Sequence, residues 1–271
     1  MSTDVYSLWR AWQEAQGLSD RTIVERERTI RQLCAHEHVG ELDITTDDIV
    51  RFTARRDVSD ASRASYHASI RAYCAWMVRA QMRDDNPAAR TISPKRPKGQ
   101  PRPVHDVQLV RMLEAANRRR TRTMVILAAF AGLRVHEVAK FHGADLDLDG
   151  GLITVTGKGG KTAMIPAHER VLLEAAGYPR DGWWFPAYGR PGHITPGAVS
   201  RAIKSTMQRA QVPGQPHQLR HWYGTTLLAG GADLRVVQTL MRHESPATTA
   251  IYTRVDVGRQ RAAIGLLDVA A

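Results

Sequence analysis

The sequence contains little cysteine, with only Cys34 and Cys74 among its 271 residues. Two thiols exclude a small disulfide-held scaffold and are typical of a protein from a reducing compartment. Long hydrophobic runs are also missing, since the longest strongly apolar stretch, residues 124–133, is too short to cross a bilayer. The N-terminus lacks the basic and apolar segments of a signal peptide. These absences together predict a cytoplasmic protein.

Acidic residues are the minority among the charged ones. Lys and Arg number 38 against 27 Asp and Glu, which gives a formal net charge of +11 at pH 7. A surplus of this size favours a polyanionic partner, and nucleic acid is the commonest one. A basic protein that is merely soluble remains the alternative. The hydrophobic content of 43% is that of a globular chain, and 271 residues suffice for two ordinary domains or one large one.

The first ninety residues follow helical patterns. Residues 5–12 carry apolar side chains with the i, i+3, i+4, i+7 spacing of one helix face. The residues of this face are Val5, Leu8, Trp9 and Trp12. Three more helices are expected after polar residues that favour helix starts. These residues are Ser19, Thr46, and Ser59 or Ser62.

A proline-rich segment, residues 91–105, separates this helical region from the rest. Its four prolines prevent regular helix and favour an extended tether. A solvated linker and a basic tether lying along a phosphate backbone are both compatible with this composition. The basic residues of the segment are Lys95, Arg96, Lys98 and Arg102.

The pattern changes after residue 105. Asp106 is expected to cap a helix, and residues 124–131 are apolar enough to form a buried one. Residues 146–166 alternate between apolar and polar side chains around glycine-rich turns, which predicts short strands. Thr195 before a proline, and Asp233 before an apolar stretch, indicate two further helix starts. The sequence thus predicts a mostly helical second domain that contains a small sheet.

The stretch PHQLRHWYGTT places His217 and His221 at i and i+4, so on a helix they share a face. A metalloprotease helix would need the pattern H-E-x-x-H, and the glutamate is absent here. Arg220 instead puts a fixed positive charge towards the same face, which opposes metal binding. No metal is therefore expected at this segment.

GKGGKT, residues 157–162, ends like a phosphate-binding Walker A loop. The full motif needs a glycine where this sequence has Val155, and it needs a helix after the loop. Strand-like residues flank the segment on both sides, so a hairpin tip that exposes Lys158 and Lys161 fits better. A solvated turn is the simplest interpretation of those lysines.

GLRVHEV, residues 132–138, follows the apolar helix. Arg134 and Glu137 lie one helical turn apart. A surface ion pair would contribute little to stability. The other interpretation is an arginine that a carboxylate holds in place and directs at a phosphate.

Together with MRHESPATTAIYTRV, residues 241–255, these motifs resemble the tyrosine recombinase (phage integrase) family. The resemblance spans residues 106 to about 255, and the helical region before it resembles the family's core-binding domain only in layout and charge. Arginine 242 stands where the family usually has glycine. Five segments of the family match this sequence. G-L-R-x-x-E matches Arg134 with Glu137, G-K-G matches Lys158, and H-x-L-R-H matches His217, Arg220 and His221. The leucine-glycine-histidine segment matches His243, and T-x-x-Y-T matches Tyr252.

The resemblance implies DNA strand transfer through a 3′-phosphotyrosine intermediate, with Tyr252 as nucleophile. A cluster of cations would lower the pKa of a tyrosine from its usual value near 10 and favour attack. Arg134 and Arg220 would bind the non-bridging phosphate oxygens with planar forks. His217 would transfer a proton or contact the phosphate. In this scheme Lys158 protonates the leaving 5′-oxygen, His243 hydrogen-bonds the phosphate, and Glu137 and His221 support the site.

The resemblance also implies a fold class that is mainly α. It comprises a helical core-type DNA-binding domain at 1–90, the basic linker at 91–105, and a mixed α+β catalytic domain at 106–271 with a small antiparallel sheet. Because the chain begins almost directly with the first helical region, no additional arm-binding domain is expected. The DNA-binding residues are expected to be Lys95, Arg96, Lys98, Arg102 and Lys161.

The implied partners are double-stranded DNA attachment sites and further copies of the chain, assembled as a tetrameric synapse on DNA. The apolar residues of the tail are Ala262, Ile264, Leu266 and Leu267, which would dock on a neighbouring subunit or pack on their own domain. No cofactor is expected, because a covalent phosphotyrosine conserves the phosphodiester energy without ATP. The setting would be the bacterial cytosol, in association with the nucleoid.

Two other functions remain compatible with these motifs. One is a DNA-binding regulator that keeps the fold without catalysis, against which the complete set of matched residues argues. The other is an enzyme of the type IB topoisomerase kind, which would use the same chemistry without exchanging partners. The favoured interpretation is a site-specific recombinase, the integrase of a phage or another mobile element.

Overall fold

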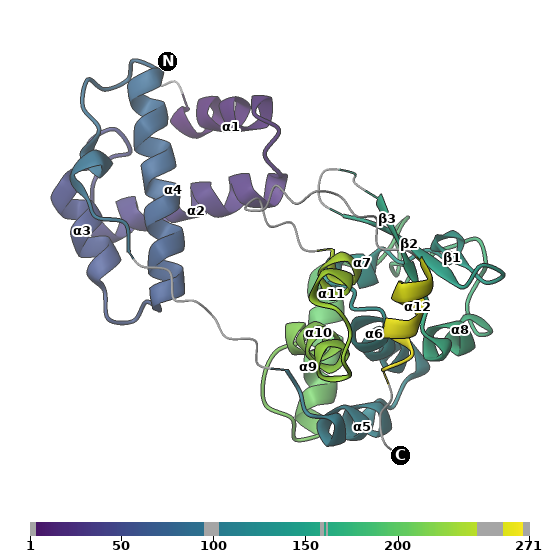
Figure 1. Ribbon diagram of the computed structural model, residues 1–271. Helices are drawn as coiled ribbons and strands as arrows, with labels where there is room; N and C mark the ends of the chain where they lie inside the picture. The colour runs from purple at the N-terminus through teal and green to yellow at the C-terminus, as the bar shows by residue number, and fades with distance from the viewer. Residues whose placement is uncertain (1–3, 95–102, 158–159, 161, 243–256, 268–271) are drawn as a thin grey trace. The chain divides into compact units, whose positions relative to one another are not determined.

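The structure is a computed structural model that describes residues 4–94, 103–157, 160, 162–242 and 257–267. The chain divides into two compact units, Met1–Gly99 and Gln100–Ala271 (Figure 1). Some of the expected functional residues lie outside the described residues. They are Lys95, Arg96, Lys98, Arg102, Lys158, Lys161, His243 and Tyr252.

The first unit is helical, and most of its helices begin at the polar residues expected. The side chain of Ser19 accepts a hydrogen bond from the Thr22 amide, and Ser59 accepts one from Ser62. The third helix begins at Thr46 behind a capping box between Thr45 and Asp48. The elements of this unit are α1 Val5–Ala15, α2 Asp20–Glu37, α3 Thr46–Ala54, α4 Asp60–Arg79 and the 3-10 helix η1 Pro87–Arg90.

Aromatic packing decides which face of α1 is buried. Trp9 is fully buried, and its ring centroid lies 4.8 Å from that of Tyr73 on α4. Residues that flank Trp9 by three or four positions, Tyr6 and Gln13, turn inward with it. Leu8 is 42% exposed, so the predicted stripe is wrong there by about one position. The reason is that the aromatic side chains of α4 fix the rotation of α1.

The second unit is mainly helical, with one small sheet. The predicted buried helix is confirmed, since every residue from 124 to 131 is buried. Helix α6 lies among α8, α9 and α10 (Figure 1). The elements are α5 Asp106–Ala115, α6 Arg119–Phe130, α7 Val135–Ala139, η2 Gly143–Asp145, β1 Leu146–Asp147, β2 Leu152–Thr156, β3 Thr162–Pro166, α8 Glu169–Ala175, α9 Pro196–Arg209, α10 His217–Ala229, α11 Leu234–Met241 and α12 Val257–Ile264.

The three strands form an antiparallel sheet in the order β1-β2-β3. In the register of β2 and β3, Ile153 faces Ile165 and Thr156 faces Thr162. Alternate residues of β2 are buried, as its sequence predicts. Because a strand follows residues 157–161, this segment lacks the helix that a Walker A loop requires. The mainly α fold class with a small antiparallel sheet is confirmed.

The start of α5 differs from the prediction. His105 is the N-cap, and its backbone amide donates to the side chain of Gln108. Asp106 is the first helical residue, and its carboxylate accepts a hydrogen bond of 2.6 Å from the indole nitrogen of Trp222 on α10. The Asp106 carboxylate, which the sequence predicts to cap its own helix, therefore binds Trp222 instead. Within the described part of the chain, no helix is long and apolar enough to span a membrane.

Candidate active site

The site begins at the turn after α6, where Gly132 reverses the chain. Its φ of +59° lies in the left-handed region that glycine adopts without strain. A Cβ on this residue would lie only 2.6 Å from Cδ1 of the Tyr223 ring. Conformation and space both require glycine here. The Gly132 carbonyl accepts hydrogen bonds from the guanidinium groups of Arg220 and Arg242.

Arg134 is the N-cap of α7, and Glu137 holds it from two sides. The Arg134 amide donates to Glu137 Oε2 at 2.7 Å, and its Nη1 donates to Glu137 Oε1 at 2.9 Å. Its Nη2 donates to the backbone carbonyl of Arg242 at 3.1 Å. The side chain is 30% exposed. The structure therefore places Arg134 and Glu137 together, with the arginine oriented by the carboxylate and still open to solvent.

Glu137 is only 2% exposed, so its charge depends on its neighbours. Burial alone would raise the pKa of this carboxyl group. The charges of Arg242 and Arg134, with the hydrogen bonds from Arg134, outweigh burial and lower the pKa below its usual value. Glu137 is therefore a buried anion that two cations stabilise.

Arg220 comes from α10 and reaches the same turn. It is 1% exposed, and it donates to the carbonyls of Gly132 and Met241. Burial lowers the pKa of its guanidinium, and the charges of Arg242 and Arg134 lower it further. The two arginines that the sequence singles out thus converge where the turn after α6 meets the end of α11.

His217 and His221 lie on the first turn of α10, as predicted. Their ring centroids are 4.6 Å apart, with the rings edge to face. His217 is exposed, whereas His221 is half-buried. Burial, followed by the charge of Arg220, lowers the pKa of His221, so this ring stays neutral over a wider range. Among the described residues, no group of three or more His, Cys, Asp or Glu side chains lies close enough together to hold a metal ion.

Arg242 joins Arg134, Glu137 and Arg220 in an arginine cluster. The sequence gives only an indirect signal that Arg242 lies there. Its Nη2 lies 3.0 Å from Glu137 Oε2, and only 9% of its side chain is exposed. The substitution of arginine for the family's glycine marks the position as unusual. The direction of the side chain depends on α11 packing against the turn at Gly132, which sequence spacing does not reveal.

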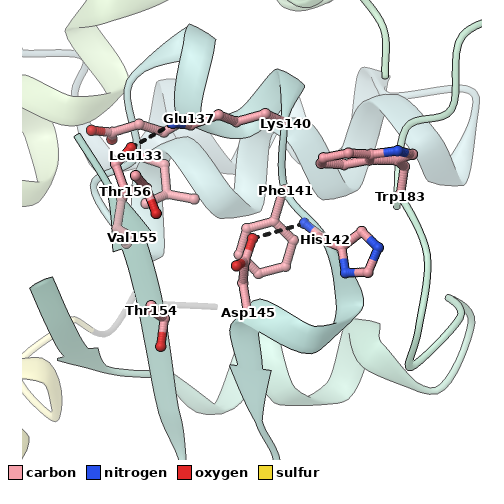
Figure 2. A pocket seen from close by; sticks show the side chains of 10 residues that line it. All are labelled: Leu133, Glu137, Lys140, Phe141, His142, Asp145, Thr154, Val155, Thr156 and Trp183. Atoms are coloured by element: carbon pink, nitrogen blue, oxygen red, sulfur yellow. Dashed lines mark hydrogen bonds between the residues drawn. The ribbon is translucent and has the colours of Figure 1, made fainter. Parts of the chain in front are cut away.

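A cavity of about 400 Å³ adjoins this cluster at Glu137. Figure 2 shows Glu137 and Lys140 at one edge of the cavity, and His142 and Trp183 at another. The Lys140 ammonium donates to the carbonyl of Thr156 at 2.5 Å. This contact, which the sequence analysis missed, anchors the end of β2 from which the predicted lysine hairpin starts.

The pattern that defines the phage integrase family matches residues 104–259. Among curated relatives, tyrosine recombinase XerD of Caulobacter vibrioides is 32% identical over 221 residues, which cover 74% of this chain and 72% of the relative. Tyrosine recombinase XerC of Xanthomonas campestris pv. campestris is 30% identical over 256 residues, which cover 90% of this chain and 74% of the relative.

Solved structures agree with this assignment. An integrase from mycobacterium phage Brujita has 44% sequence identity and a TM-score of 0.59, with 98% of this chain and 93% of that chain covered. A lambda integrase dimer bound to a COC′ core site has 16% identity and a TM-score of 0.72, with 93% and 98% covered, and this likeness supports the fold. The family resemblance is confirmed: the chain belongs to the phage integrase family of tyrosine recombinases.

Proposed function

We propose that this chain, a site-specific tyrosine recombinase, cleaves and rejoins duplex DNA through a 3′-phosphotyrosine intermediate as the integrase of a phage or another mobile element. The observation that carries the proposal is the convergence of Arg134 and Arg220 on one turn. Two guanidinium groups held by a buried carboxylate and by backbone carbonyls form a preorganised anion site. The relatives are named as recombinases or integrases, so a regulator and a topoisomerase-like enzyme are not favoured.

In the proposed reaction the phenol oxygen of Tyr252 attacks the scissile phosphorus as the bond to the 5′-oxygen breaks. The proton of Tyr252 passes to His217, and Lys158 gives a proton to the leaving 5′-oxygen. Arg134, Arg220 and His243 stabilise the charge on the phosphate oxygens, where loss of one preorganised donor costs about 10²–10³ in rate. A 5′-hydroxyl from the partner strand then attacks the phosphotyrosine and releases the enzyme.

We propose a division of labour that follows the chain. Residues 1–90 form a core-type DNA-binding domain, residues 91–105 a basic linker along the backbone, and residues 106–271 the catalytic domain. The surplus of positive charge supports DNA as the partner. Lys161 and the four linker cations are the proposed phosphate contacts. Such an enzyme would work in the bacterial cytosol on nucleoid DNA.

Oligomerisation on DNA would use the C-terminal tail. In the single chain, α12 packs on its own unit, where Ala263, Ile264 and Leu267 are buried and Leu266 is 39% exposed. Ala262 is exposed as well, so two of the four predicted apolar residues, Ala262 and Leu266, lie outside the buried face. The Nε2 of His168 lies 2.7 Å from the Leu267 carbonyl oxygen. We propose that the surface of β3 and α11 on which α12 packs accepts the tail of a neighbouring subunit in a tetrameric synapse.

A trapped covalent adduct tests the proposed chemistry. Duplexes that bind the Tyr252→Phe variant are first selected from a random library and then remade with a nick beside the cleavage point. The wild-type chain is expected to give a denaturant-resistant protein–DNA adduct, because the short 5′-hydroxyl fragment diffuses away. The Tyr252→Phe variant is expected to give none.

The matched control is Tyr188→Phe, which removes a phenol hydroxyl from a fully exposed tyrosine and is expected to leave the adduct unchanged. An adduct that persists in Tyr252→Phe, or is missing from the wild type, contradicts the proposal. Relaxation of supercoiled plasmid that lacks the selected site, by a monomer, would favour a topoisomerase instead.

A further inference from the structure

Arg242 occupies a backbone position that favours glycine. It is the C-cap of α11, with φ of 50° and ψ of 48° in the left-handed region. A residue with a side chain costs about 1–2 kcal/mol in this conformation, whereas glycine does not meet that penalty. The presence of arginine therefore calls for an interaction of its side chain that offsets the backbone cost.

The side chain of Arg242 turns into the arginine cluster. Its Nη2 donates to Glu137 Oε2 at 3.0 Å and to the Gly132 carbonyl at 3.2 Å, while its Nη1 donates to the Leu240 carbonyl at 2.8 Å. The Nε atom is buried and has no hydrogen-bond partner among the described residues. Burial of a guanidinium is costly unless an anion accompanies it, and Glu137 supplies that anion.

Arg134 and Arg242 both donate hydrogen bonds to the carboxylate of Glu137. Glu137 Oε1 accepts from Arg134 Nη1, while Oε2 accepts from the Arg134 amide and from Arg242 Nη2. In return, Arg134 Nη2 binds the Arg242 carbonyl. The result is a closed ring of contacts among three residues. Displacement of Arg242 would change both the carboxylate and the carbonyl that orient Arg134.

We propose that Arg242 is a positioning residue for strand transfer: through Glu137 and its own carbonyl it fixes the direction of Arg134. This inference rests on the proposed function. Arg242 is a third cation at the site beside Arg134 and Arg220. Three guanidinium groups and the Glu137 carboxylate have a net charge of +2, which attracts a phosphate. The lowered pKa of Glu137 agrees with this arrangement, because Glu137 remains ionised between the two arginines.

The Arg242→Gly variant is a suitable test because glycine removes the left-handed backbone penalty, which offsets part of the stability lost with the buried ion pair. Single-turnover adduct formation on the selected, nicked duplex is measured at saturating protein, and the dissociation constant is measured separately. We expect the cleavage rate to fall by roughly 10- to 100-fold, since a misdirected donor costs up to about 10²-fold. The dissociation constant is expected to stay within about threefold.

Three further variants separate positioning from folding and from charge. Arg235→Ala removes an equal charge from an exposed position of the same helix and is expected to keep the wild-type rate. Arg242→Lys keeps the charge but cannot reach three acceptors, so it should restore part of the rate. If Arg242 acts through Glu137, Arg242→Gly should slow a Glu137→Gln enzyme much less than the wild type.

Different results overturn the inference and the proposed function. Equal cleavage rates for Arg242→Gly and wild type, or full additivity with Glu137→Gln, would show that Arg242 has no positioning role while strand transfer stands. A wild-type chain that forms no adduct through Tyr252 refutes the proposed function itself. A lower melting temperature of Arg242→Gly with an unchanged rate identifies a purely structural residue, which also overturns the inference.

Discussion

At the scale of single residues, one carboxylate decides how the arginine cluster is arranged. Glu137 is buried, and it binds both Arg134 and Arg242. The pairing of Arg134 with Glu137 follows from their spacing in the sequence and is confirmed by the structure. The place of Arg242 could not be predicted in the same way, because its partner lies 105 positions away. The catalytic roles of all six residues, Arg134, Lys158, His217, Arg220, His243 and Tyr252, stay predictions.

The ionisation of Glu137 leads to a pH-dependent stability difference. Since folding lowers the pKa of Glu137 from its usual 4.5, the ionised carboxylate stabilises the fold above that value. The contribution is lost as the pH falls through the lower pKa of the folded state. We expect Glu137→Gln to reduce the free energy of unfolding by about 3–5 kcal/mol at pH 7, because it leaves the buried Arg242 and the partly exposed Arg134 without their anion. The deficit should shrink below about pH 4.5.

Urea denaturation at pH 7 and at pH 4, followed by circular dichroism, measures this difference. The matched control is Glu114→Gln, which alters an exposed carboxylate on α5 and should change stability by less than about 0.5 kcal/mol at either pH. A Glu137→Gln deficit that is equal at both pH values, or that grows on acidification, would contradict the assignment of Glu137 as a buried anion.

At the scale of elements, the accuracy of sequence-based prediction depends on how local the signal is. Ser19 and Asp233 cap helices as predicted, since a cap uses an amide two or three residues away. The two strands that flank residues 157–161 form as predicted, although alternate burial is seen in β2 and not in β3, which ends on two buried residues. Leu8 and Asp106 were assigned wrongly because distant aromatic residues determine their environments. Local patterns therefore predict where elements begin, and tertiary packing decides which face they bury.

The end of α2 provides a test of backbone strain without a catalytic role. His38 is the C-cap of this helix, with φ of 57°, and its side chain is exposed. Glycine at this position removes the left-handed penalty and loses little packing. We expect His38→Gly to stabilise α2 by about 1 kcal/mol, measured as slower hydrogen–deuterium exchange of its amides. Ala35→Gly, on an exposed interior position of the same helix, should speed exchange instead. Faster exchange in His38→Gly would show that the His38 side chain has an interaction of its own.

At the scale of the whole molecule, the excess of basic residues and the division into two units both suit a protein that binds duplex DNA with two modules. The chain carries a formal charge of +11, and the division between its two compact units, after Gly99, falls within the basic, proline-rich part of the sequence. Two modules that bind one duplex increase each other's effective concentration when a linker of suitable length joins them. The linker therefore has two possible functions, as a tether and as a contact to phosphates. Binding measured against salt concentration separates them.

Each phosphate contact contributes about −0.9 to the slope of log K against log salt for duplex DNA. Replacement of Lys95, Arg96, Lys98 and Arg102 with alanine should therefore make the slope less negative by up to about 3–4, if all four contact phosphates. The probe is a random-sequence duplex of about 30 base pairs, since the effect needs no specific site. A control that exchanges each lysine for arginine and each arginine for lysine keeps the charge and should keep the slope. An unchanged slope in the alanine variant would instead mean that the linker cations remain in solvent and that the segment acts only as a tether.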